Sequence, residues 1–321
     1  MKPFKHINVK TIDAAISALS KKSKIIAGGT DYLSLLKSSV LPVYPEILVN
    51  IKTIPGLNYL KEGAEGLRIG ALATLSDIAE SPVIKEKYGI LADAARSVAS
   101  PQIRNMGTIG GNLCQGVRCW YYRCSPLTGK SYLCYRKGGR ECFAEAGDNR
   151  YHAVIGGKAC FAVCPSDTAI ALTALDAKIK IKGPAKERTL LVKNFYRTLG
   201  NVLKPDEIVT EVQIPEAPAP KAKHSFLKFR LRKAIDFAIV SVASVIRMED
   251  GVCKGARIAL GAVAPTPIRA TKTEAAIKGK VINTTMAETA AQAAVASAAP
   301  LSMNEYKVEI TKALVKRAIL T

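Results

Sequence analysis

A strand, a pair of glycines, a helix and a second strand follow one another near the start of the chain, and this order restricts the fold more than any other feature. KIIAGGT (24–30) is a short apolar strand ending in two glycines, helical spacing resumes in 31–39, and EILVNIK (46–52) reads as the next strand. Glycines at such a turn let the backbone approach an anion, and the following helix supplies N–H groups. The unit predicts an α/β fold with a phosphate site, although a tight connection without a ligand has the same pattern.

A second glycine pair, Gly110 and Gly111, lies between apolar and amide residues in IRNMGTIGGN (103–112). Two such turns in one chain favour a phosphate-bearing cofactor. Neither turn has the G-x-G-x-x-G spacing followed by an acidic residue that is typical of a Rossmann NAD site. A nicotinamide cofactor is therefore disfavoured.

Apolar spacing predicts further helices and strands along the chain. Thr11 is placed to cap a helix over 12–21, and the alanine-rich stretch 90–107 is helical as far as Pro101. The other expected elements are a strand and a helix within 68–81, a helix over 167–175, a strand over 177–182, a strand that ends within 207–223, two strand-rich stretches within 225–270 joined by a turn at 249–251, and helices over 285–299 and 304–320. EAPAPKAK (216–223) alternates proline with alanine and is the clearest linker, so a small α+β domain is expected to start near residue 221.

Composition removes several function classes. The chain has 321 residues, 48% of them hydrophobic, so it can bury one large or two medium cores. Its formal charge of +21 is spread along the sequence and only 6% of residues are aromatic, which disfavours nucleic-acid binding. No run of about 18 apolar residues occurs and MKPFKHINVK lacks an apolar signal core, so we expect a cytoplasmic protein without a membrane span.

Seven of the eight cysteines lie between Cys114 and Cys164, and only Cys253 lies outside this segment. The paired C-x2-C knuckles of zinc sites are absent, and the spacings match neither the bacterial nor the plant-type ferredoxin pattern. Spacing alone favours a metal or iron–sulfur site and leaves scattered structural or redox thiols as the alternative.

Six stretches, in the same order along the chain, resemble the FAD-binding medium subunit of the molybdenum hydroxylase family, which includes the flavoprotein subunits of carbon monoxide dehydrogenase and xanthine dehydrogenase. They are IIAGGTDYL (25–33), IGALATLSDI (69–78), IRNMGTIGGNL (103–113), CPSDTAIALTALDA (164–177), LKFRLRKAIDFAIVSVA (227–243) and YKVEITKALVKRAI (306–319). The resemblance implies an α+β fold. It consists of an FAD-binding domain of the vanillyl-alcohol-oxidase/PCMH type over 1–217, in subdomains of about 1–52 and 53–217, and a C-terminal flavoprotein domain over 221–321.

The same resemblance assigns FAD contacts residue by residue. Asp167 matches an acidic residue near the ribityl chain and the adenine, and could also cap a helix; Lys228 matches a lysine near the isoalloxazine, with a solvated strand lysine as the alternative; Ile208 stands where the family has an apolar residue against the ring. The two glycine turns match the loops around the pyrophosphate through Lys24, Ile25, Ile26, Ala27, Gly28, Gly29, Thr30 and Asp31 in the first turn, and Thr108, Gly110, Gly111 and Asn112 in the second.

The cysteine-rich segment, about 114–164, resembles the insertion in the β subunit of 4-hydroxybenzoyl-CoA reductase, which binds a [4Fe-4S] cluster beside the flavin. That resemblance implies four ligands, Cys119, Cys134, Cys142 and Cys160. The gap between Cys142 and Cys160 is longer than expected, so Cys124 or Cys164 could replace one of them. Cys253 is expected to be a packed strand thiol.

The resemblance also implies what the chain does and with which partners. Electrons pass between an external, ferredoxin-like donor or acceptor, the [4Fe-4S] cluster, FAD, a [2Fe-2S] small subunit and a molybdenum large subunit, in a heterotrimer that dimerises. The substrate is transformed at molybdenum, so no catalytic residue is expected on this chain. The main hypothesis is a 4-hydroxybenzoyl-CoA reductase. The alternatives are the medium subunit of a purine, aldehyde or heterocycle dehydrogenase, and a basic module whose thiols hold structural zinc.

Overall fold

The computed structural model describes residues 1–128, 131–215, 217 and 222–321. Its first sheet is parallel, with the strand order β1-β3-β2. The sheet and its helices comprise β1 (Lys5–Asn8), α1 (Ile12–Ser17), β2 (Ser23–Ile26), α2 (Tyr32–Lys37) and β3 (Ile47–Asn50). The expected strand, glycine turn, helix and strand are therefore present, and the Thr11 side chain caps α1 by accepting a hydrogen bond from the Ala14 N–H.

The second sheet is antiparallel throughout, with the order β4-β5-β10-β6-β7. Its strands are β4 (Leu60–Gly63), β5 (Gly66–Gly70), β6 (Lys178–Lys182), β7 (Glu187–Leu191) and β10 (Ile208–Ile214), and a small hairpin of β8 (Tyr196–Arg197) and β9 (Gly200–Asn201) lies beside it. The helices of this part are α3 (Leu75–Glu80), α4 (Pro82–Lys87), α5 (Gly89–Arg96), α6 (Pro101–Met106), α7 (Ile109–Cys114), α9 (Asp167–Ala174) and α10 (Val192–Phe195).

Several helices end before the predicted position: the helix expected over 12–21 ends at Ser17, the helix expected over 285–299 ends at Ala294, and the stretch 90–107 differs most. The stretch 90–107 is not helical up to Pro101, because α5 ends at Arg96 and Ala99 takes a left-handed φ of 45°. Pro101 instead begins α6, where the Ser100 hydroxyl accepts a hydrogen bond from the Ile103 N–H. Proline has no N–H to donate and is favoured at the first position of a helix, so it starts the second helix rather than ending the first.

The third sheet is antiparallel with the order β11-β12-β13-β14, and three helices accompany it. Asp250 and Gly251, both with positive φ, form the expected turn between β12 and β13. The elements are β11 (Ala222–Phe229), β12 (Val240–Glu249), β13 (Val252–Gly261), β14 (Ile268–Arg269), α11 (Thr271–Ile277), α12 (Thr284–Ala294) and α13 (Tyr306–Leu320). The predicted linker 216–223 lies largely outside the described residues.

Helix α9 joins the second and third sheets. Every residue of α9 is buried, because the third sheet packs on one side of the helix and α5 on another. A helix that is apolar on all sides must be covered on all sides. The main hydrophobic core therefore includes Ala243 and Val245 of β12 and Ala259 of β13, so the two halves of the chain share it.

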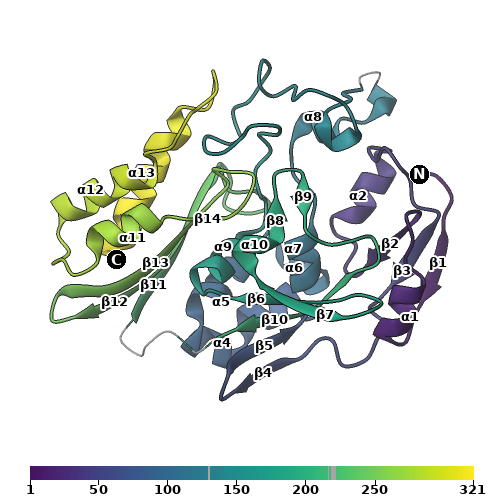
Figure 1. Cartoon of the computed structure of the whole chain (residues 1–321), viewed down its shortest axis with the longest axis horizontal. Helices are drawn as coiled ribbons and strands as arrows, with labels where there is room; N and C mark the ends of the chain where they lie inside the picture. The colour runs from purple at the N-terminus through teal and green to yellow at the C-terminus, as the bar shows by residue number, and fades with distance from the viewer. Residues whose placement is uncertain (129–130, 216, 218–221) are drawn as a thin grey trace.

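The cysteine-rich segment has little regular structure. It contains α8 (Trp120–Arg123) and two single 3₁₀ turns, Pro126–Thr128 and Tyr135–Lys137. In Figure 1 this teal segment crosses the top of the molecule, between the purple first sheet and the yellow C-terminal helices. Within the described part of the chain, no helix has both the length and the apolar character that crossing a membrane requires.

Candidate functional site

The two glycine turns lie against each other. A Cβ atom added to Gly28 would lie 2.0 Å from the Met106 carbonyl oxygen, and one added to Gly107 would lie 3.5 Å from the Thr30 hydroxyl. Gly29 has φ +70°, which residues with a side chain rarely adopt. The missing side chains therefore allow the turn after β2 and the turn before α7 to meet, and the structure brings together two segments that the sequence assigns separately to one cofactor.

Gly110 and Gly111 have different surroundings on the second turn. Gly110 packs against the backbone of the second sheet, since an added Cβ would lie 2.9 Å from the Ala71 carbonyl oxygen. Beside Gly111 the nearest atom is the Thr108 hydroxyl, 3.0 Å from such a Cβ, and the space is otherwise open. The Thr108 hydroxyl caps α7 by accepting a hydrogen bond from the Gly111 N–H. The open side of Gly111 fits a ligand that needs close approach to the backbone, as a pyrophosphate does.

Asp31 and Asn112, which the resemblance assigns to FAD contacts, also form ion pairs and hydrogen bonds with other segments of the chain. The Asp31 carboxylate forms ion pairs with Arg118 at 2.9 Å and Arg123 at 2.7 Å, and accepts a hydrogen bond from the Gly116 N–H. The Asn112 side-chain oxygen accepts hydrogen bonds from the hydroxyls of Ser166 and Thr168 at the start of α9. Their predicted FAD contacts stay predictions.

Asp167 and Lys228 come from different halves of the chain and meet in a buried ion pair. The Lys228 ammonium lies 2.6 Å from an Asp167 carboxylate oxygen, and the two side chains are only 5% and 7% exposed. The same ammonium donates to the Ser97 carbonyl oxygen. Burial raises the pKa of Asp167, although Lys228 acts in the opposite direction. Lys228 is therefore not a solvated strand lysine, and the cap of α9 is Ser166 rather than Asp167.

A cavity of about 30 Å³ lies beside this ion pair, between Arg118, Ser166, Asp167 and Phe237. The Arg118 guanidinium stacks 4.5 Å from the centre of the Phe237 ring, so residues of both halves wall the cavity. Ile208 lies elsewhere, in the core between the first sheet and β10. Its burial is explained by packing, and its predicted contact with the flavin ring stays a prediction.

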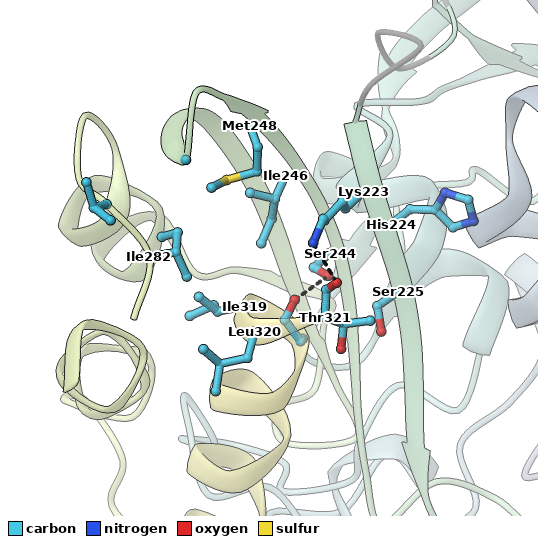
Figure 2. A pocket seen from close by; sticks show the side chains of 13 residues that line it. Lys223, His224, Ser225, Ser244, Ile246, Met248, Ile282, Ile319, Leu320 and Thr321 are labelled. Atoms are coloured by element: carbon cyan, nitrogen blue, oxygen red, sulfur yellow. Dashed lines mark hydrogen bonds between the residues drawn. The ribbon is translucent and has the colours of Figure 1, made fainter. Parts of the chain in front are cut away.

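A roomier cavity of about 250 Å³ lies between β11, β12 and the end of α13 (Figure 2). Lys223 crosses it and donates a hydrogen bond to the Thr321 carbonyl oxygen, while the other walls are formed mainly by apolar side chains such as Ile246 and Leu320. No residue that the sequence assigns to a cofactor lines this cavity. Size alone therefore does not identify the functional site.

The four predicted cluster ligands share one neighbourhood. Cys142 and Cys160 form a hydrogen bond that raises the pKa of the first thiol and lowers that of the second. Burial raises the pKa of Cys119 to about 11, and the charges of Cys160 and Cys134 contribute to this shift. Val117 and Ala162 pack beside Cys160 and Cys119. The structure thus brings together Cys119, Cys134, Cys142 and Cys160, which lie up to 41 positions apart.

The other cysteines have different surroundings. Cys164 is buried in the main core and forms a hydrogen bond with Tyr196, although it follows Cys160 by only four positions. The Cys124 thiol lies 3.7 Å from the Thr128 hydroxyl, and Cys114 is exposed at the end of α7. Cys253 is fully buried in β13, as the sequence predicts. Cys164 therefore lies apart from the four predicted ligands, and the choice between those four and a set that includes Cys124 stays a prediction.

Sequence reasoning missed the basic and imidazole groups around the cysteines. Arg136 donates from Nε to the Cys160 sulfur at 3.1 Å, and the His152 Nε2 atom lies 3.3 Å from the Cys119 sulfur. Arg118 and Arg123 reach back to the first glycine turn. The sequence carries no pattern that points to Arg136 or His152, because the arginines next to cysteines in VRC (117–119) and YRC (122–124) pair with Asp31 instead.

The thiols do not form a site for a single metal ion. In residues 1–128, 131–215, 217 and 222–321, no three His, Cys, Asp or Glu side chains are placed to hold one ion, which gives the structural zinc alternative no support. A [4Fe-4S] cluster needs four thiolates arranged around a larger body than one ion. Cys119, Cys134, Cys142 and Cys160 supply that number of thiols, and Arg136 donates an N–H to one of their sulfurs.

Replacing Lys228 by Met is expected to lower the free energy of unfolding by about 3–5 kcal/mol, because it leaves the Asp167 carboxylate buried without its partner. Loss of the ammonium raises the pKa of Asp167 further, so the folded chain binds a proton that the unfolded chain releases above about pH 4. Stability of the variant therefore falls as pH rises, and thermal unfolding at pH 5 and pH 8 measures the difference.

Two further variants serve as controls for this result. Adding Asp167→Asn to Lys228→Met removes the stranded charge and is expected to restore part of the stability and to abolish its pH dependence. Lys22→Met removes an exposed ion pair with Glu46 and is expected to change little. A Lys228→Met protein as stable as its parent at pH 8 contradicts the assignment of a buried charged pair.

Family models match most of the chain. The model described as the FAD binding domain in molybdopterin dehydrogenase matches residues 2–120 and 141–217, and the model described as the CO dehydrogenase flavoprotein C-terminal domain matches 225–321. The first match is interrupted at 121–140, within the cysteine-rich segment. These matches account for both halves of the fold and leave out part of the segment that holds the thiols.

Similar proteins cover nearly the whole length. The chain is 35% identical to the aldehyde oxidoreductase FAD-binding subunit PaoB of Escherichia coli, over 97% of this chain and 96% of that one. It is 26% identical to the putative xanthine dehydrogenase FAD-binding subunit XdhB of the same species, over 96% and 92%. A structure of carbon monoxide dehydrogenase from Hydrogenophaga pseudoflava aligns with a TM-score of 0.79 and 27% identity, over 99% and 96%. With its fold, its glycine turns and these matches, the chain belongs to the family of FAD-binding medium subunits of molybdenum hydroxylases, together with those of carbon monoxide dehydrogenase and xanthine dehydrogenase.

Proposed function

We propose that this chain is the electron-transfer flavoprotein subunit of a molybdenum-containing aldehyde oxidoreductase. The observation that carries the proposal is the 35% identity to an aldehyde oxidoreductase FAD-binding subunit along almost the full length of both chains. The similarity to a putative xanthine dehydrogenase subunit supports the wider class of hydroxylases. These relatives favour the aldehyde and purine alternatives over a 4-hydroxybenzoyl-CoA reductase, which is the second candidate.

The glycine turns are the proposed FAD site. Backbone N–H groups around Gly28 and Gly29 would hold the pyrophosphate. The N–H groups of Gly110 and Gly111 already donate to the Ala71 carbonyl oxygen and the Thr108 hydroxyl, so the second turn would contribute the open space beside Gly111 instead. FAD accepts electrons in pairs and releases them singly, which lets it join two-electron and one-electron carriers. The buried Asp167–Lys228 pair holds the Asp167 carboxylate at the wall of the cavity of about 30 Å³ between the two halves of the chain. In this proposal the pair orients the flavin and the chain contributes no catalytic acid or base.

The cysteine-rich segment is the proposed [4Fe-4S] site, with Cys119, Cys134, Cys142 and Cys160 as ligands. Three observations support it: the four thiols share one neighbourhood, Cys164 lies in the main core instead, and residues 121–140, which include Cys134, fall outside the family match. Half-buried aromatic rings pack on one another within the segment, mostly edge to face: Trp120, Tyr121, Tyr132 and Phe143.

The proposed partners are a molybdenum large subunit, a [2Fe-2S] small subunit and a ferredoxin-like donor or acceptor, in a heterotrimer that dimerises. The division into domains at 217 and 221 is part of the same proposal. It is supported by family matches that end at 217 and begin again at 225. The third sheet and its helices have a hydrophobic core of their own, and the sheet also contributes Ala243, Val245 and Ala259 to the main core, so the two proposed domains bury surface against each other.

The test is purification of a tagged chain with its partners from its native host. We expect two further subunits, molybdenum, a flavin plus iron–sulfur absorption spectrum, and reduction of the spectrum by aromatic or aliphatic aldehydes. If aldehydes leave the spectrum unchanged and 4-hydroxybenzoyl-CoA instead reoxidises enzyme that a low-potential donor has reduced, losing its hydroxyl group as water, the result supports the second candidate. A chain that purifies alone, colourless and with bound zinc, contradicts both.

A further inference from the structure

Two side chains outside the predicted ligand set hydrogen bond to the sulfurs of that set. Arg136 donates from Nε to the Cys160 sulfur at 3.1 Å, and the His152 Nε2 atom lies 3.3 Å from the Cys119 sulfur. Hydrogen bonds to sulfur are among the main factors that set the potential of an iron–sulfur cluster. The inference below rests on the proposed cluster and concerns how this chain controls it.

Both donors are held in place by other parts of the chain. The Arg136 guanidinium also donates to the Thr198 carbonyl oxygen, between β8 and β9. The His152 ring is only 3% exposed and lies edge-on to Trp120, with 5.6 Å between ring centres. The His152 carbonyl oxygen accepts hydrogen bonds from Asn304 at 3.2 Å and from Lys307, at the start of α13, at 2.8 Å. The donors are therefore positioned before any cluster is bound.

The direction of the His152 hydrogen bond follows from the ligand chemistry. A cysteine that binds iron is a thiolate, which accepts and cannot donate. The proton of the ring must then be on Nε2, and Nδ1 becomes an acceptor. Nδ1 is buried and has no hydrogen-bond partner in the described part of the chain, so nothing there opposes this tautomer.

We infer that Arg136 and His152 are positioning residues that raise the reduction potential of the [4Fe-4S] cluster by donating N–H hydrogen bonds to Cys160 and Cys119. A cluster reduced by one electron would carry one more negative charge, and its sulfurs would be stronger hydrogen-bond acceptors. The two N–H groups therefore stabilise the reduced form more than the oxidised form. The N–H groups of Arg136 and His152 would therefore favour transfer of an electron from the external donor to the cluster.

The test measures the cluster potential in the purified holoenzyme by redox titration followed with electron paramagnetic resonance. Arg136→Met removes one donor, and His152→Asn removes the other. Each is expected to lower the equilibrium constant for adding the electron about tenfold, which for one electron is about 59 mV more negative. His152→Gln places an amide N–H closer to the position of Nε2 and is expected to recover part of the shift.

The control for the loss of a positive charge without loss of a sulfur hydrogen bond is Arg140→Met, which removes one positive charge from an exposed side chain in the same segment. In this variant the equilibrium constant for adding an electron to the cluster is expected to stay within about twofold of the parental value, because water and salt screen exposed charges. Iron is counted first in every sample. If the parent protein holds no [4Fe-4S] cluster, the proposed cluster is wrong and this inference falls with it. Full clusters with unchanged potentials in both Arg136→Met and His152→Asn overturn the inference alone and leave the proposed function intact.

Discussion

Cys134→Ser and Cys142→Ser proteins are each expected to lose about four iron atoms per chain, those of the proposed [4Fe-4S] cluster, and to keep one FAD per chain. Both thiols belong to the group around Cys160, whereas the proposed FAD contacts are backbone amides on the glycine turns. Electron transfer from a low-potential donor should fall to background, and artificial dyes that reach the flavin directly should still react. Iron and flavin quantitation, with electron paramagnetic resonance, measures both cofactors in the same sample.

Matched controls come from cysteines in other surroundings. Cys114→Ser changes an exposed thiol close in sequence to the ligands and is expected to keep the cluster. Cys164→Ser tests the neighbour of Cys160 that lies in the main core instead. A full cluster in Cys134→Ser, or its loss in Cys124→Ser, shows that the wrong four cysteines were chosen. The serine variants at Cys119 and Cys160 complete the set.

Gly111→Val is expected to weaken FAD binding about a hundredfold, or about 2.8 kcal/mol, with the fold preserved. The side chain would occupy the open space beside the second glycine turn, where the pyrophosphate needs contact with the backbone. Stability should change by less than about 1 kcal/mol, because valine and glycine differ little as helix residues and the only close neighbour is the Thr108 hydroxyl. Flavin fluorescence after denaturation, compared with protein concentration, gives the occupancy.

The control for this variant is Gly63→Val. Gly63 lies at the exposed end of β4, and no atom of the described residues would lie within 4 Å of its added Cβ. The same substitution there is expected to leave FAD at the parental level. Gly28→Val is a poor test, because the new side chain would collide with the Met106 carbonyl oxygen and separate the two turns. Full flavin occupancy in Gly111→Val contradicts the placement of FAD on this turn.

Local features of the fold were predictable because short-range chemistry determines them. The strand, glycine turn and helix at 23–37, the Thr11 cap and the turn at Asp250 follow from residue types at fixed spacing. The end of α5 was not predictable in the same way. Its alanine-rich sequence continues to favour helix, and the chain leaves it only because Ala99 takes a left-handed φ and Ser100 caps the next helix.

Contacts between distant segments required the structure. The resemblance assigns Asp167 and Lys228 to one cofactor, but their direct ion pair depends on the third sheet packing over α9. Ile208 has the expected apolar character, and its place in the core beside the first sheet depends on the position of β10 in the sheet order. The hydrogen bonds of Arg136 and His152 to sulfur arise in a segment with little regular structure, where periodicity carries no information.

The Asp31 ion pairs have a consequence for how the first glycine turn and the cysteine-rich segment depend on each other. Asp31 stands on a turn within the family match, whereas Arg123 stands in the 121–140 stretch that the family model leaves out. The stretch is therefore anchored to the family fold by a carboxylate of the first glycine turn. Deleting the stretch would remove one of the two counter-charges of Asp31, and replacing Asp31 would remove the ion pair that holds the stretch carrying Cys124 and Cys134. One acidic side chain thus couples the first glycine turn to the cysteine-rich segment.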